Sequence, residues 1–289
     1  MSDFMFTGYD AAMSVSDSPI LFLDSGIGGL PYLDWVAGSR PDLPLVYVAD
    51  TRNFPYGELK ADRLRNVVVD AAEKAFLRFQ PRLMVLACNT ASVAALEHVR
   101  AAVSCPVVGT VPAVKPAASL ETDKPIGILA TEGTVNSSYL DDLIETFAPG
   151  RRVVRVAAGD IVRYVEEKYS GEADSEARRV IRPAVKKLQS EDAGSVVLGC
   201  THFLHITELI GDMLGADVPL VDSCEGVGRR ILALAGEPPS GYSSSLAVPV
   251  WEPVREPGQK IFVVTQGGLR DERYRFFSAF HHLNWMGEF

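Results

Sequence analysis

The stretches VLACNT at residues 85–90 and VLGCTH at residues 197–202 have the same layout. Each is an apolar run, one small residue and a cysteine, followed at once by hydroxyl or amide side chains. Such a run is typical of a buried parallel strand that ends where open α/β sheets bind ligands. We therefore expect Cys88 and Cys200 to form an opposed pair of thiols. The alternative is that either cysteine only packs as a small apolar residue.

Two other stretches indicate that the chain repeats one α/β unit. LFLDSGIGGL at 21–30 and IGILATEGTV at 126–135 each join a strand, a polar pair, a glycine and a helix start. The interval from Asp24 to Cys88 is close to the interval from Thr131 to Cys200. The repeat predicts an α/β fold of two similar, pseudosymmetric domains, whose parallel sheets face each other across a cleft.

The repeat also predicts the domain boundaries, and 289 residues suffice for two medium domains. Residues 19–111 and 221–289 are expected to form the first domain, and residues 112–220 the second. Residues 1–18 have neither a basic start nor a continuous apolar run, so we predict a flexible N-terminal extension rather than a secretory signal. Residues 236–260 are rich in Pro, Gly and Ser and are expected to be a connector.

Composition narrows the classes of function. The formal charge of −9 and the pI near 5.1 disfavour nucleic acid and anionic membrane as partners. No apolar stretch is long enough to cross a bilayer. The four cysteines lack CxxC or metal-site spacing, which favours reduced thiols in a cytoplasmic protein. We expect a small-molecule substrate and leave a homodimer open.

Other segments carry structure rather than chemistry. Apolar positions at helical spacing predict a helix over residues 60–79, and KIFVVT at 260–265 is expected to be the last strand. We interpret His98 as structural. His281 and His282 are adjacent but lack a third ligand, so we interpret them as surface residues and predict no metal site.

Two facing thiols suit the inversion of a carbon that bears an acidic hydrogen. One thiolate removes the proton from one face, and the other thiol returns a proton to the opposite face. His202 follows Cys200 closely enough to favour its thiolate, and Asp24 is a candidate to orient Cys88 or relay its proton. Neutral donors and acceptors for ammonium and carboxylate groups are Ser25, Asn89, Thr90, Thr131, Thr134 and Thr201. The glycine-rich turn after Asp24 can also present N–H groups to an anion.

Five motifs occur along the chain in the order DSGIGGL, NFPYG, ACNTAS, GT followed by PA, and GCTH. In these motifs and in their order, the chain resembles the glutamate racemase family, within the aspartate/glutamate racemase superfamily. The resemblance covers most of residues 19–235. It implies a cofactor-independent, two-base amino-acid racemase of two pseudosymmetric domains, which supplies D-glutamate for peptidoglycan in bacteria.

The resemblance also implies roles for matching positions. Cys88 and Cys200 become the acid/base residues, assisted by Asp24 and His202, and the VE pair aligns Glu166 with an assisting glutamate. The implied substrate contacts are Ser25, Pro55, Tyr56, Gly57, Asn89, Thr90, Thr131, Thr134 and Thr201. This chain departs from the family at Asn53, where arginine is common, at Leu204, where proline is usual, and in the segment AAGDIVRYVEE.

Three alternatives are also compatible with the sequence. The chain could be a superfamily relative that racemises aspartate or a hydantoin, or a decarboxylase of substituted malonates, which would need only one thiol. It could also be a catalytically silent binding protein that keeps the fold.

Overall fold

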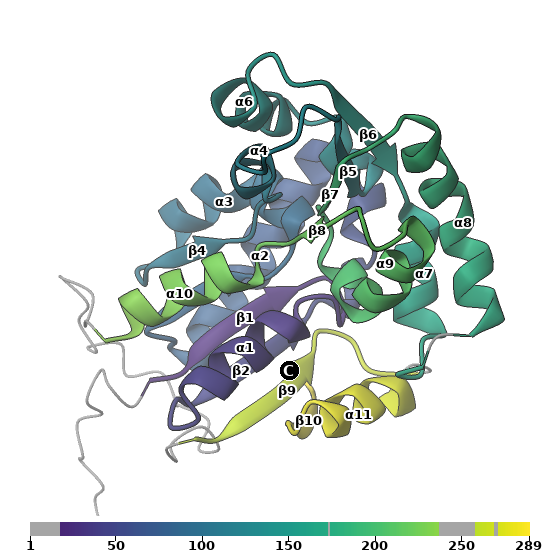
Figure 1. The fold of residues 1–289 in the computed structure, drawn as a ribbon. Coiled ribbons are helices and arrows are strands. Elements are labelled where there is room, and N and C mark those ends of the chain that lie inside the picture. The colour runs from purple at the N-terminus through teal and green to yellow at the C-terminus, as the bar shows by residue number, and fades with distance from the viewer. Residues whose placement is uncertain (1–17, 173, 237–257, 269–270) are drawn as a thin grey trace, which may run out of the picture.

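The computed structural model describes residues 18–172, 174–236, 258–268 and 271–289 (Figure 1). The predicted N-terminal extension lies outside these residues except for Ser18, and so does most of the predicted connector.

The first sheet has six strands in the order β10-β9-β2-β1-β3-β4, and every adjacent pair is parallel. At its centre, β1 (Ile20–Asp24), β2 (Leu45–Ala49) and β3 (Leu83–Leu86) are buried along their whole length. Continuous apolar runs suit these positions because helices cover both faces of the sheet. The outer strands are β4 (Val107–Gly109), β9 (Lys260–Val264) and β10 (Asn284–Glu288).

The second sheet has four parallel strands in the order β6-β5-β7-β8. They are β5 (Ile126–Ala130), β6 (Val153–Ala157), β7 (Ser195–Leu198) and β8 (Leu220–Val221). The order of β5, β6, β7 and β8 repeats that of β1, β2, β3 and β4, so the predicted α/β repeat and fold class are confirmed. The domain boundaries stay a prediction, and Val221 at one of them pairs with Val197 of β7.

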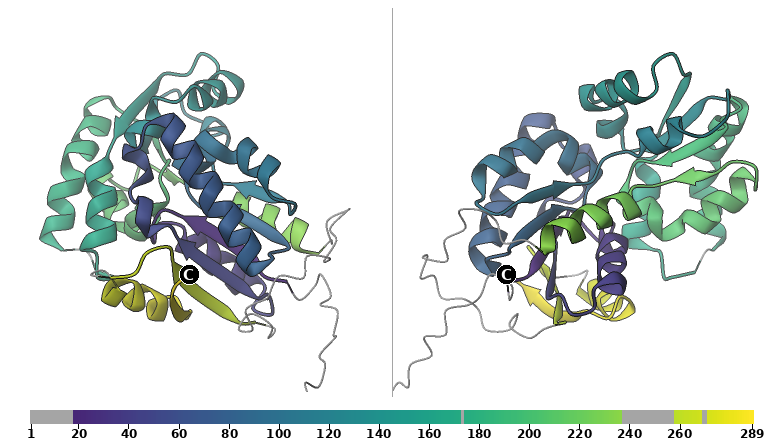
Figure 2. Two further views of the ribbon diagram at one scale, coloured as in Figure 1. Left: turned by 180° about the vertical axis from the view of Figure 1, so that it is seen from behind. Right: turned by 60° about the vertical axis from the view of Figure 1, so that its left-hand side comes forward.

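The helices of the first sheet lie on its two faces. Alternate residues of β1 point to opposite cores, as Ile20 packs in the cluster with α1 (Leu30–Ser39) and Leu21 in the cluster with α2 (Ala61–Phe79). The helix α3 (Asn89–Ala102) joins α2, and α10 (Cys224–Ala235) joins α1. The predicted helix over residues 60–79 is therefore confirmed as α2. Figure 2 shows α10, in light green, returning to the first sheet after the second.

One continuous apolar cluster joins the second sheet and its helices to the first sheet. The remaining helices are α4 (Val114–Ala118), α5 (Glu132–Val135), α6 (Ser138–Phe147), α7 (Gly159–Glu167), α8 (Ser175–Ser190), α9 (Thr207–Leu214) and α11 (Asp271–Phe280). Three short 3-10 helices are η2 (Thr51–Asn53), η3 (Tyr56–Glu58) and η4 (Thr201–Ile206).

The C-terminal segment corrects two predictions. The strand over residues 260–265 is not the last, because β10 follows α11 and pairs with β9 at the edge of the sheet. Its half-exposed sequence NWMGE lacks the continuous apolar run that marks the central strands. His281 is only 8% exposed, and its Nδ1 contacts a carboxylate oxygen of Asp34 on α1. It is therefore not a surface residue, whereas His98 and His282 are exposed.

Two absences apply to the described ranges alone. No helix there is long and apolar enough to span a membrane. No group of three or more His, Cys, Asp or Glu side chains there is arranged to hold a metal ion. All four cysteines lie within the described part of the chain and are free.

The contact between α1 and α10 gives a stability prediction. A Cβ at Gly228 would overlap the indole of Trp35, whereas a Cβ at Gly226, two residues earlier on α10, meets nothing within 4 Å. We expect Gly228→Ala to destabilise the protein by about 1–3 kcal/mol. Gly226→Ala should be neutral or stabilising, because alanine is the better helix former. Thermal unfolding of both variants measures this, and equal shifts in midpoint would contradict the close packing.

Candidate functional site

Cys88 and Cys200 occupy equivalent positions at the ends of β3 and β7. Each directly precedes a helix, and their backbone angles are nearly equal, with φ −137° and ψ 119° at Cys88 and φ −140° and ψ 134° at Cys200. Each residue is 6% exposed. The repeat therefore places two thiols in matching frames at the carboxyl edges of two sheets.

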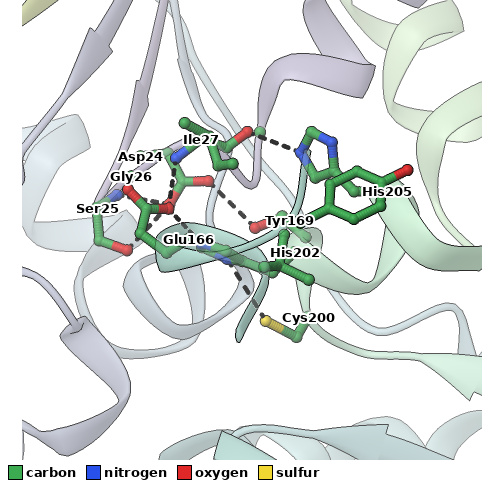
Figure 3. Close-up of polar contacts among 12 residues, drawn as sticks. Asp24, Ser25, Gly26, Ile27, Glu166, Tyr169, Cys200, His202 and His205 are labelled. Atoms are coloured by element: carbon green, nitrogen blue, oxygen red, sulfur yellow. Dashed lines mark hydrogen bonds and ion pairs between the residues drawn. The ribbon is translucent and has the colours of Figure 1, made fainter. Parts of the chain in front are cut away.

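A chain of polar contacts leads away from Cys200 (Figure 3). Its Sγ lies 4.0 Å from Nδ1 of His202, and Nε2 of the same ring lies 2.9 Å from Oε2 of Glu166. Glu166 comes from the end of α7 and is fully buried. Glu166, which the VE pair matched to an assisting glutamate, is therefore in direct contact with His202.

The contact between His202 and Glu166 is a buried ion pair. Burial alone would lower the pKa of His202, but its hydrogen bonds to Cys200 and Glu166 raise that pKa well above the usual value. Burial alone would raise the pKa of Glu166, but His202, the N–H of Ile27 and the hydroxyl of Tyr274 lower it. The Nδ1 side of this protonated imidazole faces the sulfur of Cys200.

The glycine-rich turn after β1 fits closely against this pair. Ile27 N–H donates to Oε2 of Glu166 at 3.0 Å, so the anion that the turn binds is a side chain of the protein itself. A Cβ at Gly26 would overlap the Glu166 carboxylate, and one at Gly28 would overlap the His202 ring. Glycine is required at both positions because the backbone approaches these side chains so closely.

Cys88 has a different electrostatic environment. Burial and the nearby carboxyl group of Asp24 raise the pKa of its thiol well above the usual value, against the N–H of Ala91 at the start of α3. Burial also raises the pKa of Asp24, although His202 and the N–H of Ser25 act against this. Asp24 accepts hydrogen bonds from Ser25 N–H at 2.5 Å and from the hydroxyl of Thr201 at 3.1 Å. Thr201 thus connects the Cys88 side to the second sheet.

Three threonines meet where the two sheets approach. The hydroxyl of Thr90 lies 3.0 Å from that of Thr131 and 3.4 Å from that of Thr134, and Thr131 donates to Thr134 at 3.1 Å. Asn89 beside them is 2% exposed, and neither its amide nitrogen nor its amide oxygen has a hydrogen-bond partner. An unsatisfied buried amide is costly, so Asn89 is available to bind a ligand next to Cys88.

The NFPYG segment reaches the same region from the first sheet. Gly57 faces Thr131 so closely that a Cβ would lie 3.0 Å from the threonine Cβ. Pro55 and Gly57 line a cavity of about 620 Å³ together with Thr131 and residues of α7 and α8. The Tyr56 hydroxyl donates to Asp50 at 2.7 Å and so fixes the segment to the end of β2.

The sequence did not reveal several residues that hold the site together. The hydroxyl of Tyr47 receives Gly29 N–H and donates to the carbonyl of Gly26, which fixes the turn. Arg273 and Tyr274 of α11 contact the end of α7, although more than 100 residues separate them from it. Of the two residues that depart from the family pattern, Asn53 donates to the carboxylate of Asp50, and Leu204 is half-buried in η4.

Comparison with known proteins identifies the family of the chain. The model of the Asp/Glu/hydantoin racemase family matches residues 35–227. The glutamate racemase of Sphingopyxis alaskensis is 44% identical over 223 residues, which is 75% of this chain and 82% of that protein. The glutamate racemase of Shewanella loihica is 39% identical over 224 residues, which is 77% of this chain and 83% of that protein.

Solved structures extend the match to the whole fold. The Escherichia coli glutamate racemase, in complex with L-glutamate and the activator UDP-MurNAc-Ala, has a TM-score of 0.79 at 32% identity and covers 94% of this chain and 98% of its own. A glutamate racemase isoform of Bacillus anthracis has a TM-score of 0.76 at 22% identity, covers 94% of this chain and 97% of its own, and supports the fold alone. The chain therefore belongs to the glutamate racemases of the Asp/Glu/hydantoin racemase family.

Proposed function

We propose that this chain interconverts L- and D-glutamate with two cysteines and without a cofactor. The observation that carries the proposal is the pair of thiols at equivalent strand ends, beside a buried amide that lacks a partner. The glutamate racemases among its relatives support glutamate as the substrate, since two of them share 44% and 39% identity with it.

In the proposed reaction, one sulfur acts as a base and the other as an acid. When Cys200 is the thiolate, it removes the Cα proton of one enantiomer, and the electron pair delocalises into the substrate carboxylate. The Cys88 thiol then delivers its proton to the opposite face of Cα. The reverse reaction exchanges the two roles, so each turnover leaves one thiol and one thiolate.

The partners of each sulfur suit these roles. The protonated His202 stabilises a thiolate at Cys200, and Glu166 keeps His202 protonated. Cys88 has its pKa raised by burial and by Asp24, which favours the thiol form that donates a proton. Asp24, whose own pKa is raised by burial, is suited to take the Cys88 proton in the other direction.

The proposed substrate contacts carry no charge. The hydroxyl and amide side chains among them bind the ammonium and carboxylate groups without a fixed charge that would compete with the thiolate. These contacts are Ser25, Pro55, Tyr56, Gly57, Asn89, Thr90, Thr131, Thr134 and Thr201. Asn89 contributes most directly, because a bound substrate would supply the partner that its amide lacks.

The proposal also covers the domains, the cellular role and the oligomeric state of the protein. We assign the two sheets to two domains that contribute one cysteine each. The family implies that the enzyme supplies D-glutamate for peptidoglycan in the cytoplasm. A homodimer is compatible with the proposal, since both cysteines come from one chain.

Turnover in heavy water tests the two-base mechanism. The proton that leaves with one sulfur differs from the proton that the other delivers, so the first product formed should carry deuterium at Cα. The recovered substrate should remain largely undeuterated. Mass spectrometry of both enantiomers at low conversion measures this. Product that retains the substrate hydrogen would indicate a single base.

Serine substitutions separate the two sulfurs. Cys88→Ser and Cys200→Ser should each slow racemisation by about a hundredfold or more, because a hydroxyl is a poor acid and base near neutral pH. Each variant should still eliminate a leaving group from the β carbon of a glutamate analogue, since elimination needs only one base. The two variants should act on opposite enantiomers of the analogue. Near-normal racemisation by either variant would refute the mechanism.

The glycine turn provides a geometric test. Gly26→Ala should displace the Glu166 carboxylate from His202. We expect kcat/KM to fall by about a hundredfold, because a displacement of about 1 Å in a catalytic group can cost that much. Gly38→Ala is the matched control, because a Cβ there meets nothing within 4 Å. Equal activity of the two variants would show that the contact between Gly26 and Glu166 does not matter.

A further inference from the structure

The Glu166 carboxylate is held from two sides. Its Oε2 accepts hydrogen bonds from Ile27 N–H at 3.0 Å and from His202 Nε2 at 2.9 Å. Its Oε1 accepts a hydrogen bond from the Tyr274 hydroxyl at 2.8 Å. Tyr274 comes from α11, which lies beyond the family match at residues 35–227.

Tyr274 belongs to a column of stacked aromatic rings. It is 1% exposed and stacks on Phe262 at 6.1 Å, and Phe262 stacks on Tyr47 at 5.2 Å. The hydroxyl of Tyr47 holds Gly26 and Gly29 in the glycine turn. One column therefore fixes both the turn and the carboxylate that packs against it.

The residue before Tyr274 fixes the backbone that carries Glu166. Arg273 donates to the carbonyls of Val165 and Tyr169 at 2.7 Å each, and also to the carbonyl of Glu166 itself. The carbonyls of Val165 and Glu166 belong to the last turn of α7, where no intrahelical donor reaches them, and that of Tyr169 lies just beyond the helix. Adjacent residues of α11 thus bind the main chain and the side chain of Glu166.

We propose that Tyr274 is a positioning residue that holds Glu166 against His202 and thereby supports proton transfer at Cys200 but not at Cys88. The proposal rests on the function assigned above. The asymmetry follows from the contacts, because Glu166 hydrogen-bonds His202, and His202 faces Cys200, whereas Cys88 has Asp24 beside it.

Racemisation alone cannot separate the two halves of the site. Because enantiomers have equal free energy, kcat/KM must be the same in both directions for every variant. Elimination from the β-substituted glutamate analogue avoids this constraint, since each enantiomer reports the base on one side only.

The test combines Tyr274→Phe with each serine variant. In the Cys88→Ser background, where Cys200 is the remaining base, Tyr274→Phe should slow elimination by about tenfold, the expected effect of losing one hydrogen bond to a charged group. In the Cys200→Ser background, elimination should change by less than about twofold. Equal losses in both backgrounds, or no loss in either, would overturn the proposal.

Tyr164→Phe is the matched control. It removes a similar phenol, 4% exposed, from α7 itself, but its hydroxyl donates to Asp174 at 2.9 Å rather than to Glu166. It should leave elimination unchanged in both backgrounds. If the unsubstituted protein does not racemise glutamate, the proposed function fails. If it does and Tyr274→Phe behaves like Tyr164→Phe, only the present inference fails.

A pH profile gives a second measure that misfolding would not imitate. The Tyr274 hydroxyl lowers the pKa of Glu166, so its removal should raise that pKa and move the acid limb of kcat/KM to higher pH. A purely structural loss would lower the plateau and leave the limb in place. The groups that face Glu166 are Asp24 of β1, Tyr47 of β2, His202 of η4, and Arg273 and Tyr274 of α11.

Discussion

The buried ion pair between Glu166 and His202 is the interaction on which the site depends. Two charges removed from water cost several kcal/mol each unless hydrogen bonds replace the lost solvation. Here the turn after β1, the end of α7, η4 and α11 all meet at the pair. The close packing of Gly26 and Gly28 against these side chains follows from the same requirement, because any larger residue would separate the partners.

This arrangement gives two equivalent backbone frames two different chemical environments. Cys88 and Cys200 share nearly the same backbone angles, yet a carboxyl group lies beside the first and a protonated imidazole beside the second. The two sulfurs therefore have neighbours of opposite charge character, a carboxyl group that raises the pKa of Cys88 and an imidazolium that faces Cys200. Racemisation needs one acid and one base at the same moment. Different neighbours for the two cysteines suit this need, whereas a strictly symmetric site would treat both sulfurs alike.

The amino-acid sequence determined the parts that are local in the chain. Continuous apolar runs predicted the central strands, the repeated motif predicted two parallel sheets, and the cysteine frames predicted where each strand ends. These features depend on neighbouring residues, so they can be read without a structure. The edge strand β10 was missed because NWMGE is half-exposed and lacks a continuous apolar run.

Only the tertiary structure decided which distant side chains meet. His281, interpreted as a surface residue, is buried and contacts Asp34, because the residue that follows α11 reaches a side chain of α1. Glu166 was matched to the family's assisting glutamate from the VE pair alone. Its position in the site depends on four segments that meet at its carboxylate, namely the turn after β1, α7, η4 and α11. Tyr274 gave no local signal, since it lies 108 positions after Glu166 and its role arises from a single long-range hydrogen bond. Sequence patterns report the period of a strand or helix, whereas such contacts depend on how the elements pack.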